Sequence, residues 1–210
     1  MPRNAVPDAI MRRLPRYYRH LGVLLSHKTA RISSKELSKK MGITASQIRQ
    51  DLNHFGGFGQ QGYGYNVQFL YDEIKKIIGL IRDYNMIVIG AGNLGQTLTN
   101  YTNFEKRGIY IKALFDTNPA LIGKSVRGIK IYDFDTIGDY IRDNVVDIAV
   151  LSIPASSAPA TAEILVANKI RCIWNFSPID LSLPEDVVVE NVYLTDSLVS
   201  LVYKLNENKE

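Results

Sequence analysis

One segment of the chain has the glycine spacing of a pyrophosphate-binding loop: Gly90-Ala91-Gly92-Asn93-Leu94-Gly95, followed by Gln96. It comes directly after the apolar run 86–89, which is typical of a central parallel strand, and it opens a helix that extends through Tyr101. Gly90 permits the tight turn, Gly92 lets a pyrophosphate approach the backbone, and Gly95 lets the helix pack on the strand. The helix N-terminus adds partial positive charge. We expect residues 90–96 to bind a dinucleotide; a glycine turn that binds nothing is the alternative.

Asp116 ends the next predicted strand, Tyr110–Phe115, and lies 26 residues after Gly90. A carboxylate at this place can accept hydrogen bonds from the hydroxyls of an adenosine ribose. Its charge repels the additional phosphate of NADP, and Thr117 and Asn118 provide no compensating arginine. The pattern therefore favours NAD(H).

Two further segments follow later strands of the same predicted sheet, namely Ser152-Ile153-Pro154 and Asn175-Phe176-Ser177-Pro178. Open parallel sheets bind ligands at the carboxyl ends of their strands. We expect the nicotinamide end of the ligand to lie against Ile153, Pro154 and Asn175, close to Tyr101.

Residues 33–54 have the pattern of a helix-turn-helix. Ser33 and Glu36 have the spacing of a capping box for a short helix, which Gly42 ends. Thr44 can cap a second helix, whose buried face is expected to be Ile43, Ile48 and Leu52. Its outward side chains pair well with base edges, as Arg does with guanine and Gln or Asn with adenine. A merely solvated face predicts more Glu and Lys. The expected DNA-binding residues here are Thr44, Ser46, Gln47, Arg49, Gln50, Asn53 and His54.

Residues 55–65 mix glycines with aromatic and polar residues, a composition that predicts a short hairpin. After a helix-turn-helix, such a hairpin would be the wing of a winged-helix domain. Gln60, Gln61 and Tyr63 are expected to reach the minor groove from its tip.

Other elements must hold these sites in place. A helix is predicted over Pro7–Ser26, broken or kinked by Pro15 unless a shorter helix begins there. A connecting helix is predicted over Tyr71–Ile81. The last helix, Thr195–Leu205, has an apolar face that predicts contact with a partner subunit. The remaining expected elements alternate as in a doubly wound sheet: strands 147–153, 170–174 and 187–192, and a helix 157–168.

The expected architecture is α/β, with three parts. A winged-helix domain with its connecting helix occupies residues 1–82, a Rossmann-type doubly wound parallel sheet domain 83–193, and a C-terminal interface helix 194–210. Residues 1–85 carry 14 Lys and Arg against 6 Asp and Glu, whereas residues 86–210 carry 11 against 15. A basic first part suits a polyanion, although uneven surface charge for solubility is the alternative.

Several classes of protein are disfavoured. Cys172 is the only cysteine, so an intrachain disulfide is excluded, and its apolar neighbours predict a buried strand thiol in a reducing cytosol. The chain has neither an apolar signal sequence nor a run of about 18 uncharged apolar residues, so we expect a cytoplasmic protein. No metal site is expected, because the three histidines lack partners at metal-ligand spacing.

The same residues argue against an enzyme. A nicotinamide dehydrogenase usually needs a proton-donating side chain beside its substrate, yet no histidine follows His54. Tyr71 and Lys75 have the Tyr-x-x-x-Lys spacing of some dehydrogenases, but they precede the glycine loop. A sensor of another nucleotide, such as coenzyme A, and a dehydrogenase remain the alternatives.

With these motifs in order, the chain resembles the Rex family of redox-sensing transcriptional repressors. The resemblance implies a homodimer of winged-helix and Rossmann domains, with the C-terminal helix exchanged between subunits. It also implies that the chain binds promoter DNA when NADH is scarce and releases it when NADH binds. Five segments carry it: Arg13-Leu14-Pro15-x-Tyr17-x-Arg19, Gln47-Ile48-Arg49-x-Asp51-Leu52, Gly62-x-Gly64-Tyr65, Gly90-x-Gly92-x-x-Gly95 and Asn175-Phe176-x-Pro178.

The chain departs from the family pattern in its DNA contacts. The wing tip and the position after Arg49 more often carry Lys or Arg, whereas this chain has Gln60, Gln61 and Gln50. Fewer phosphate contacts, or different base preferences, are therefore expected.

The family's switch is the second departure. The resemblance implies a link between the two domains through Arg19, Tyr101 and a carboxylate, but Tyr193 stands where the acid is often found, and Asp196 is the nearest replacement. Burying the cationic ring of NAD⁺ costs more than burying neutral dihydronicotinamide. We therefore expect NADH alone to seat deeply, to move Tyr101 and the last helix, and to change the spacing of two reading helices that must fit half-sites about 34 Å apart.

Overall fold

The computed structural model describes residues 7–55, 59–60 and 63–207, and it separates the chain into two compact units, Met1–Arg82 and Asp83–Glu210. Each unit has its own hydrophobic core. Among the described residues, no helix combines the length and the apolar character that crossing a membrane requires.

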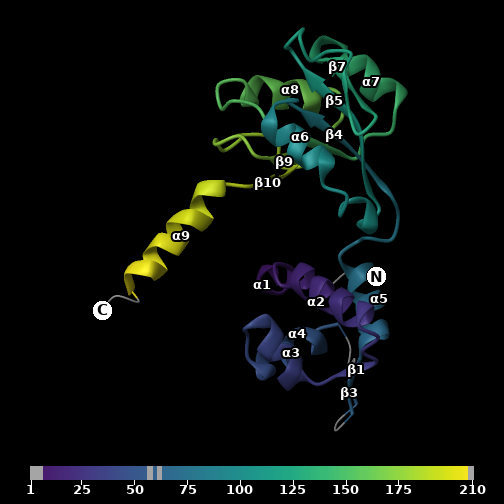
Figure 1. Cartoon of the computed structure of the whole chain (residues 1–210), viewed down its shortest axis with the longest axis vertical. Coiled ribbons are helices and arrows are strands. Elements are labelled where there is room, and N and C mark those ends of the chain that lie inside the picture. The colour runs from purple at the N-terminus through teal and green to yellow at the C-terminus, as the bar shows by residue number, and fades with distance from the viewer. Residues whose placement is uncertain (1–6, 56–58, 61–62, 208–210) are drawn as a thin grey trace. The chain divides into compact units, whose positions relative to one another are not determined.

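Within its described residues, the first unit contains five helices and a small antiparallel sheet with the strand order β1-β3-β2 (Figure 1). This is the architecture of a winged helix, as the sequence predicts. The elements are α1 Asp8–Met11, α2 Leu14–Ser26, β1 Arg31–Ile32, α3 Ser34–Met41, α4 Ala45–Asn53, β2 Gly59–Gln60, β3 Gly64–Asn66 and α5 Val67–Ile77.

Local chemistry sets the helix boundaries of this unit. The predicted helix over residues 7–26 is divided, because α2 begins at Leu14 and Pro15 occupies its first turn, where a missing N–H costs nothing. The capping box of Ser33 and Glu36 is confirmed, and Gly42 ends α3 in the left-handed conformation with a φ of 65°. Thr44 caps α4 by accepting a hydrogen bond from the backbone N–H of Gln47.

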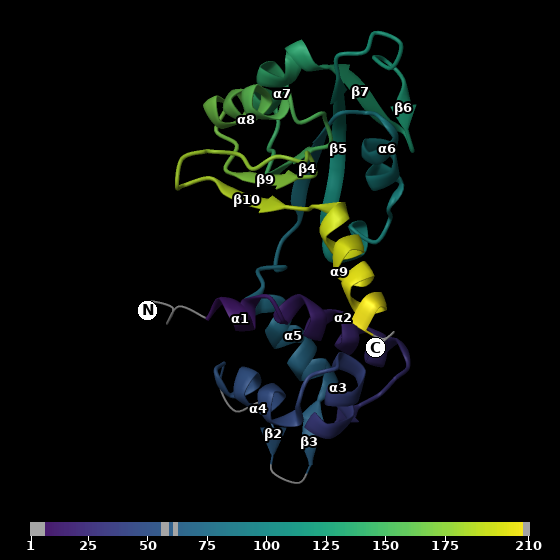
Figure 2. The same ribbon diagram turned by 90° about the vertical axis from the view of Figure 1, so that its left-hand side faces the viewer.

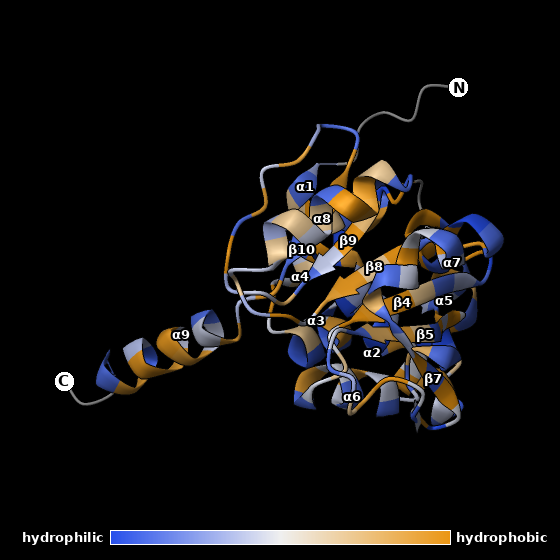
Figure 3. Cartoon of the chain, turned by 90° about the horizontal axis from the view of Figure 1, so that it is seen from above, coloured by the Kyte–Doolittle hydropathy of each residue, from blue (hydrophilic) through white to orange (hydrophobic). Residues whose placement is uncertain are grey.

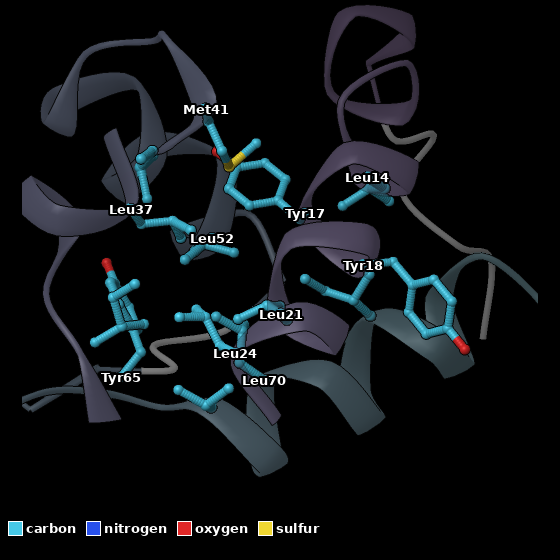
Figure 4. Packing of buried hydrophobic residues seen from close by; sticks show 14 residues of the cluster. Leu14, Tyr17, Tyr18, Leu21, Leu24, Leu37, Met41, Leu52, Tyr65 and Leu70 are labelled. Carbon is cyan, nitrogen blue, oxygen red and sulfur yellow. The ribbon is translucent and has the colours of Figure 1, made fainter. Parts of the chain in front are cut away.

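The helix expected at Tyr71–Ile81 lies four residues earlier in the chain, and besides preceding the second unit it packs in the core of the first. It begins at Val67, because the Asn66 side chain accepts a hydrogen bond from the backbone N–H of Phe69 and so caps it. It also belongs to the core of the first unit, since Leu70 and Ile74 are fully buried against α2. Figure 4 shows Leu70 beside Leu21 and Leu24 in this core.

The second unit, as described through residue 207, is built on a seven-stranded, mostly parallel sheet with the order β10-β9-β8-β4-β5-β7-β6, in which β6 alone pairs antiparallel. The strands are β4 Tyr84–Ile89, β5 Ile109–Asp116, β6 Ser125–Val126, β7 Ile129–Asp133, β8 Ile148–Leu151, β9 Cys172–Asn175 and β10 Val188–Asn191. The helices are α6 Asn93–Asn100, α7 Ile137–Asp143, α8 Ala158–Ala167 and α9 Leu194–Glu207, with short 3-10 turns at Glu105–Arg107 and Phe134–Thr136.

Both faces of the sheet are covered, which confirms the doubly wound arrangement. Along the central strand β4, Ile87 and Ile89 face the core formed with α7 and α8, whereas Met86 and Val88 face the core on the side of α6. Figure 2 shows α7 and α8 on one side of the strands and α6 on the other. The order of the strands reverses at β4, whose neighbours are β5 and β8. In open sheets a ligand crevice forms at this reversal.

Three elements between residues 117 and 146 were not predicted from the sequence, namely β6, β7 and α7. Each is short, and the two-residue strand β6 has no periodicity of its own to detect. Cys172 also differs from expectation, because it is only half-buried at the start of β9. Burial, and then the nearby Asp147, raise the pKa of its thiol.

The C-terminal helix α9 buries none of its side chains among the described residues. Leu198 and Leu201 are 60% and 61% exposed, and Val202 and Leu205 are exposed as well. Figure 3 shows this apolar stripe along α9. An exposed apolar stripe of this kind marks a contact surface.

Candidate DNA-reading surface and dinucleotide site

The glycine loop has the backbone shape that its spacing predicts. Gly90 has a φ of 94°, and a Cβ there would lie 2.5 Å from the carbonyl oxygen of Ser152. A Cβ on Gly95 would collide with the carbonyl oxygen of Gly90. By contrast, a Cβ on Gly92 would meet nothing within 4 Å. The expected roles of Gly90 and Gly95 are thereby confirmed, and Gly92 faces the open space that a close-approaching ligand requires.

Three side chains from different elements hold this loop. The Asp116 Oδ2 atom accepts a hydrogen bond of 2.6 Å from the backbone N–H of Ala91. The Gln96 amide donates to the Ala91 carbonyl at 2.7 Å, and the Ser152 hydroxyl donates to the Gly90 carbonyl at 2.9 Å. The loop is therefore fixed before any ligand binds. Ser152, which closes it from the end of β8, was not among the expected site residues.

The N-terminus of α6 is open to a ligand. Gly92 is its N-cap and supplies no side-chain hydrogen bond, whereas Ser33 and Thr44 cap α3 and α4. The first N–H groups of a helix lack partners within the helix, and they attract anions. Asn93 is exposed at this end, and Leu94 is partly buried.

Asp116 lies at the carboxyl end of β5 and remains able to bind a ribose. Its second oxygen, Oδ1, accepts a 2.8 Å hydrogen bond from the backbone N–H of Asn118. A carboxylate offers about four lone-pair positions, so two remain after these two backbone bonds. Asp133 is the partner of Asp116 in the register of β7, and it places a second acidic residue at the same edge. Sequence reasoning missed Asp133 because it missed β7.

Among the residues expected to contact the nicotinamide, Asn175 is already held by hydrogen bonds within the protein. Ile153 is partly buried and Pro154 is exposed, whereas Asn175 is fully buried. The Asn175 amide donates to the Ile179 carbonyl and to Asn191 Oδ1, both at 2.8 Å, and its oxygen accepts from the backbone N–H of Ser177. Asn175 thus already has partners for every polar atom of its side chain, and its contact with a cofactor stays a prediction.

A chain of hydrogen bonds continues from this end of the sheet to the start of α9. The Ser177 hydroxyl donates to the Ile153 carbonyl at 2.7 Å. Asn191, which is bonded to Asn175, donates to Asp180 at 3.2 Å, and the Tyr193 hydroxyl donates to the same carboxylate oxygen at 2.5 Å. This bond to Asp180 raises the pKa of Tyr193. Asp180 and Asn191 had no signal in the sequence, because neither belongs to a motif.

An aromatic row joins the end of α6 to the end of β9. Tyr101, which is 51% exposed, contacts Phe104 edge-to-face at 5.0 Å between ring centroids. Phe104 contacts Trp174 at 5.7 Å, and Trp174 contacts Phe176 at 4.6 Å. The row makes Trp174 a natural fluorescent reporter for this region.

Helix α4, the expected recognition helix (called the reading helix below), exposes most of the residues expected to contact DNA. Those fully on the surface are Thr44, Ser46, Arg49, Gln50, Asn53 and His54. Gln47 is only partly exposed, and its side chain is engaged within the unit. The Arg49 guanidinium donates to the Ser34 hydroxyl at 3.2 Å, and the His54 ring contacts Phe55 edge-to-face.

Beneath this surface lies Asp51, whose side chain is fully buried. The Arg13 guanidinium donates a hydrogen bond of 2.7 Å to each of the two carboxylate oxygens of Asp51. The Tyr17 hydroxyl and the Gln47 amide also donate to this carboxylate, both at 2.9 Å. Burial by itself would raise the pKa of Asp51, but the hydrogen bonds from Arg13, Gln47 and Tyr17 outweigh it and lower that pKa. The hydrogen bond between Arg13 and Asp51 also raises the pKa of the Arg13 guanidinium. This network joins α4 to α2.

The predicted hairpin is confirmed by antiparallel pairing of β2 and β3, with Gly59 opposite Tyr65. Tyr63 is 71% exposed, and Arg31 donates to its carbonyl at 3.3 Å with the guanidinium 6.0 Å from its ring centroid. Gln61 and the side chain of Gln60 lie outside the described residues. Of the expected switch residues, Arg19 and Asp196 are both exposed.

Known families match both units. A family described as "Putative DNA-binding protein N-terminus" matches residues 5–53, and one described as "CoA binding domain" matches residues 81–179. The chain is 56% identical over 207 residues to the redox-sensing transcriptional repressor Rex of Thermoanaerobacter sp. (strain X514), covering 99% of this chain and 92% of that protein. It is 57% identical over 201 residues to Rex of Clostridium botulinum (strain Hall), covering 96% of both.

Solved structures match over nearly the whole chain. The crystal structure of RSP in complex with β-NAD⁺ and operator DNA has a TM-score of 0.91 and 56% identity, covering 99% of this chain and 95% of that chain. RSP in complex with β-NADH has a TM-score of 0.90 and 53% identity, covering 99% of this chain and 97% of that one. RSP is described as a Rex-family repressor.

Proposed function

This chain belongs to the Rex family of redox-sensing transcriptional repressors, and from that premise we propose that it binds promoter DNA when NADH is scarce and leaves it when NADH binds. The observation that carries the proposal is the match along 99% of the chain to RSP, a protein solved both with NAD⁺ and operator DNA and with NADH. Membership of a family of repressors also means that the chain is a regulator and not an enzyme.

The dinucleotide is held, in this proposal, by residues 90–96. Gly92 offers room for the pyrophosphate, and the uncapped N-terminus of α6 offers N–H groups and partial positive charge. Asp116 would accept the ribose hydroxyls with the lone pairs that its two backbone bonds leave. Asp116 and its register partner Asp133 would both disfavour the additional phosphate of NADP.

NADH and NAD⁺ differ in the charge of the nicotinamide ring. Beside Ile153 and Pro154, a cationic ring loses hydration without gaining a partner charge, whereas the neutral ring of NADH loses little. We infer that the reduced form seats more deeply. The hydrogen bonds that run from the Ile153 carbonyl through Ser177, Asn175 and Asn191 to Asp180 supply a route by which this seating reaches Tyr193 and α9.

The exposed apolar stripe of α9 is assigned to a second copy of the chain. A homodimer would present two α4 helices to two half-sites about 34 Å apart, and a change in their spacing would weaken operator binding. Operator DNA must in turn weaken NADH binding by the same factor, because the coupling of two binding sites is reciprocal. Since such a repressor acts where the promoters are, we place it in the cytoplasm.

A sensor of coenzyme A is the second candidate, and the match of residues 81–179 to the CoA binding domain family favours it. The adenosine of coenzyme A carries a phosphate on its ribose, which the acidic pair Asp116 and Asp133 opposes. Thermal unfolding of the chain with NADH, NAD⁺, NADPH or coenzyme A separates the two candidates. We expect NADH to raise the midpoint most. A rise with coenzyme A and none with NADH would favour the second candidate.

The decisive experiment is a gel shift on promoter DNA over a series of NADH to NAD⁺ ratios at one fixed salt concentration, because affinity for DNA depends strongly on salt. We expect operator affinity to fall as the NADH fraction rises, by about 5- to 150-fold for a typical coupling. Operator affinity that does not respond to NADH would refute the switch.

A further inference from the structure

We propose that Gln47 reads an adenine in each half-site, with its amide fixed in one orientation by the buried Asp51. The inference rests on the proposed function, since it assumes that α4 enters the major groove. It goes beyond that function by assigning one base to one side chain and by separating Gln47 from Gln50, which lies on the same helix.

The first observation is that the N-terminus of α4 has only one of the two hydrogen bonds of a capping box. At α3, Ser33 accepts a bond from the backbone N–H of Glu36, and Glu36 accepts one from the backbone N–H of Ser33 at 2.9 Å. At α4, Thr44 and Gln47 have the same spacing, and Thr44 accepts a 3.1 Å bond from the backbone N–H of Gln47. The Gln47 side chain does not return the bond. It extends one helical turn forward to Asp51 instead.

The second observation is that Asp51 cannot adapt to Gln47. Both of its oxygens are held by Arg13, and Tyr17 donates to one of them. The lowered pKa keeps the carboxylate ionised near neutral pH, so it only accepts hydrogen bonds. The amide nitrogen of Gln47 must therefore face Asp51, because the reverse orientation would place the amide oxygen against a buried negative charge.

What remains of Gln47 for DNA is fixed by this orientation. A primary amide has two N–H groups and one oxygen, and the bond to Asp51 uses one N–H. The other N–H and the oxygen form a donor and acceptor pair. Adenine presents the matching edge in the major groove, since its N7 atom accepts and its N6 amino group donates. Guanine presents two acceptors there, which a fixed amide oxygen would repel.

Gln50 supplies the contrast. It is exposed on α4, and within the part of the chain that the structure describes its side chain has no hydrogen-bond partner. Its amide can rotate to present either a donor or an acceptor. We therefore assign the fixed base preference to Gln47 and none to Gln50.

The test uses the full-length chain and a duplex that it has selected from a randomised library. Each adenine is replaced, in both half-sites at once, by 7-deazaadenine, which lacks the N7 acceptor, or by purine, which lacks the N6 amino group. We expect one adenine position at which either analogue weakens wild-type binding by about 10- to 100-fold. Gln47→Ala should bind these duplexes and the parent duplex nearly equally. Gln50→Ala, whatever affinity for DNA it loses overall, should keep the wild-type ratio between its affinities for the parent duplex and for the analogue duplexes at that position.

Two outcomes would overturn the proposal: wild-type binding that tolerates both analogues at every adenine, or a Gln47→Ala variant that stays as sensitive as the wild type. Asp51→Asn tests the orientation separately, because an asparagine can accept or donate and would let Gln47 turn over. If this variant folds, its preference for adenine over guanine at that position should fall, and an unchanged preference would refute the role of Asp51. If it does not fold, the Gln47 and Gln50 variants still decide.

A failure of the proposed function has a different signature. It would appear as a wild-type chain that selects no sequence, or that does not release its duplex when NADH is added. A failure of the adenine assignment alone leaves selection and NADH-dependent release intact. Thermal unfolding midpoints of both glutamine variants, measured beside these titrations, show that each keeps its fold.

Discussion

Two aspartates organise the two units, and they do so by different means. Asp51 holds the reading helix through side chains only, with Arg13, Tyr17 and Gln47 as its partners. Asp116 holds the glycine loop by accepting a hydrogen bond from the backbone N–H of Ala91, and its other oxygen accepts one from the backbone N–H of Asn118, two residues further along the chain. The reading surface is therefore held by hydrogen bonds between side chains, whereas the sensor loop is held by side chains that bond to its backbone and by the absence of Cβ atoms at Gly90 and Gly95.

This difference also separates what each unit tolerates. The Asp51 side chain is fully buried, so losing Arg13 leaves its negative charge without a compensating cation. The glycine loop contains no buried charge. Which substitutions it tolerates depends instead on the room for a Cβ atom, which is absent at Gly90 and Gly95 and present at Gly92. The following predictions would break or sharpen this comparison, beginning with the largest expected effect.

Arg13→Met should destabilise the DNA-reading unit most. It removes the cation that both oxygens of the fully buried Asp51 contact, and breaking such a pair costs about 3–5 kcal/mol of unfolding free energy. Because the Arg13 side chain is 22% exposed, we expect a loss near the lower end. Denaturant unfolding of the full chain measures it, and Arg12→Met, at the exposed neighbouring position, is the control. A loss equal to that of the control would contradict a stabilising ion pair.

Gly95→Ala and Gly92→Ala should differ in kind. Alanine at 95 collides with the Gly90 carbonyl, so the loop must shift, at a cost of about 1–3 kcal/mol in unfolding free energy, and NADH binding should be lost. Alanine at 92 meets no protein atom, so the unfolding midpoint should stay at the wild-type value while NADH affinity falls.

Calorimetric unfolding and fluorescence titration of Trp174 with NADH measure these two quantities. If Gly92→Ala bound NADH as the wild type does, the pyrophosphate would not approach the loop at that residue.

Asp116→Asn should change the choice of dinucleotide more than the fold. The asparagine oxygen can still accept from the Ala91 N–H, while the bond from the Asn118 N–H and the negative charge beside the ribose are removed. We expect the preference for NADH over NADPH to fall by about tenfold, roughly 1.4 kcal/mol, with Asp133 retaining part of the repulsion. Titrations with both dinucleotides give the ratio, and Asp135→Asn serves as a nearby exposed control. An unchanged ratio would remove Asp116 from cofactor selection.

Mild acid should weaken the DNA-reading unit through Asp51. The pKa of Asp51 is lower in the folded chain than its ordinary value, so its contribution to stability is present above about pH 4 and is lost as the pH falls through the lowered value. The unfolding midpoint should therefore decrease below about pH 4, and Asp51→Asn should flatten this decrease. Equal acid sensitivity in the wild type and the variant would argue that other carboxylates dominate.

Residues close together in the chain could be understood from the sequence. The capping box of Ser33 and Glu36, the turn at Gly42 and the cap at Thr44 each join residues within about one helical turn, so a local pattern suffices to predict them. The glycine loop was also predictable, because Gly90 has a φ of 94° that few other residues adopt, and because Gly95 has no room for a Cβ atom. Together these signals were enough for the two architectures and their order.

The partners of buried polar groups were decided by the tertiary structure alone. Arg13 and Asp51 are 38 residues apart, and Asp116 reaches back 25 residues to Ala91. Asn191 and Asp180 entered the network around Asn175 only because β9 and β10 lie side by side. Likewise, helix α5 is part of the core of the first unit because the fold places it against α2. A buried polar atom needs a hydrogen-bond partner, and that partner must be one of the groups that the fold places next to it. The sequence directly shows which residues are neighbours along the chain, but not which residues packing brings together.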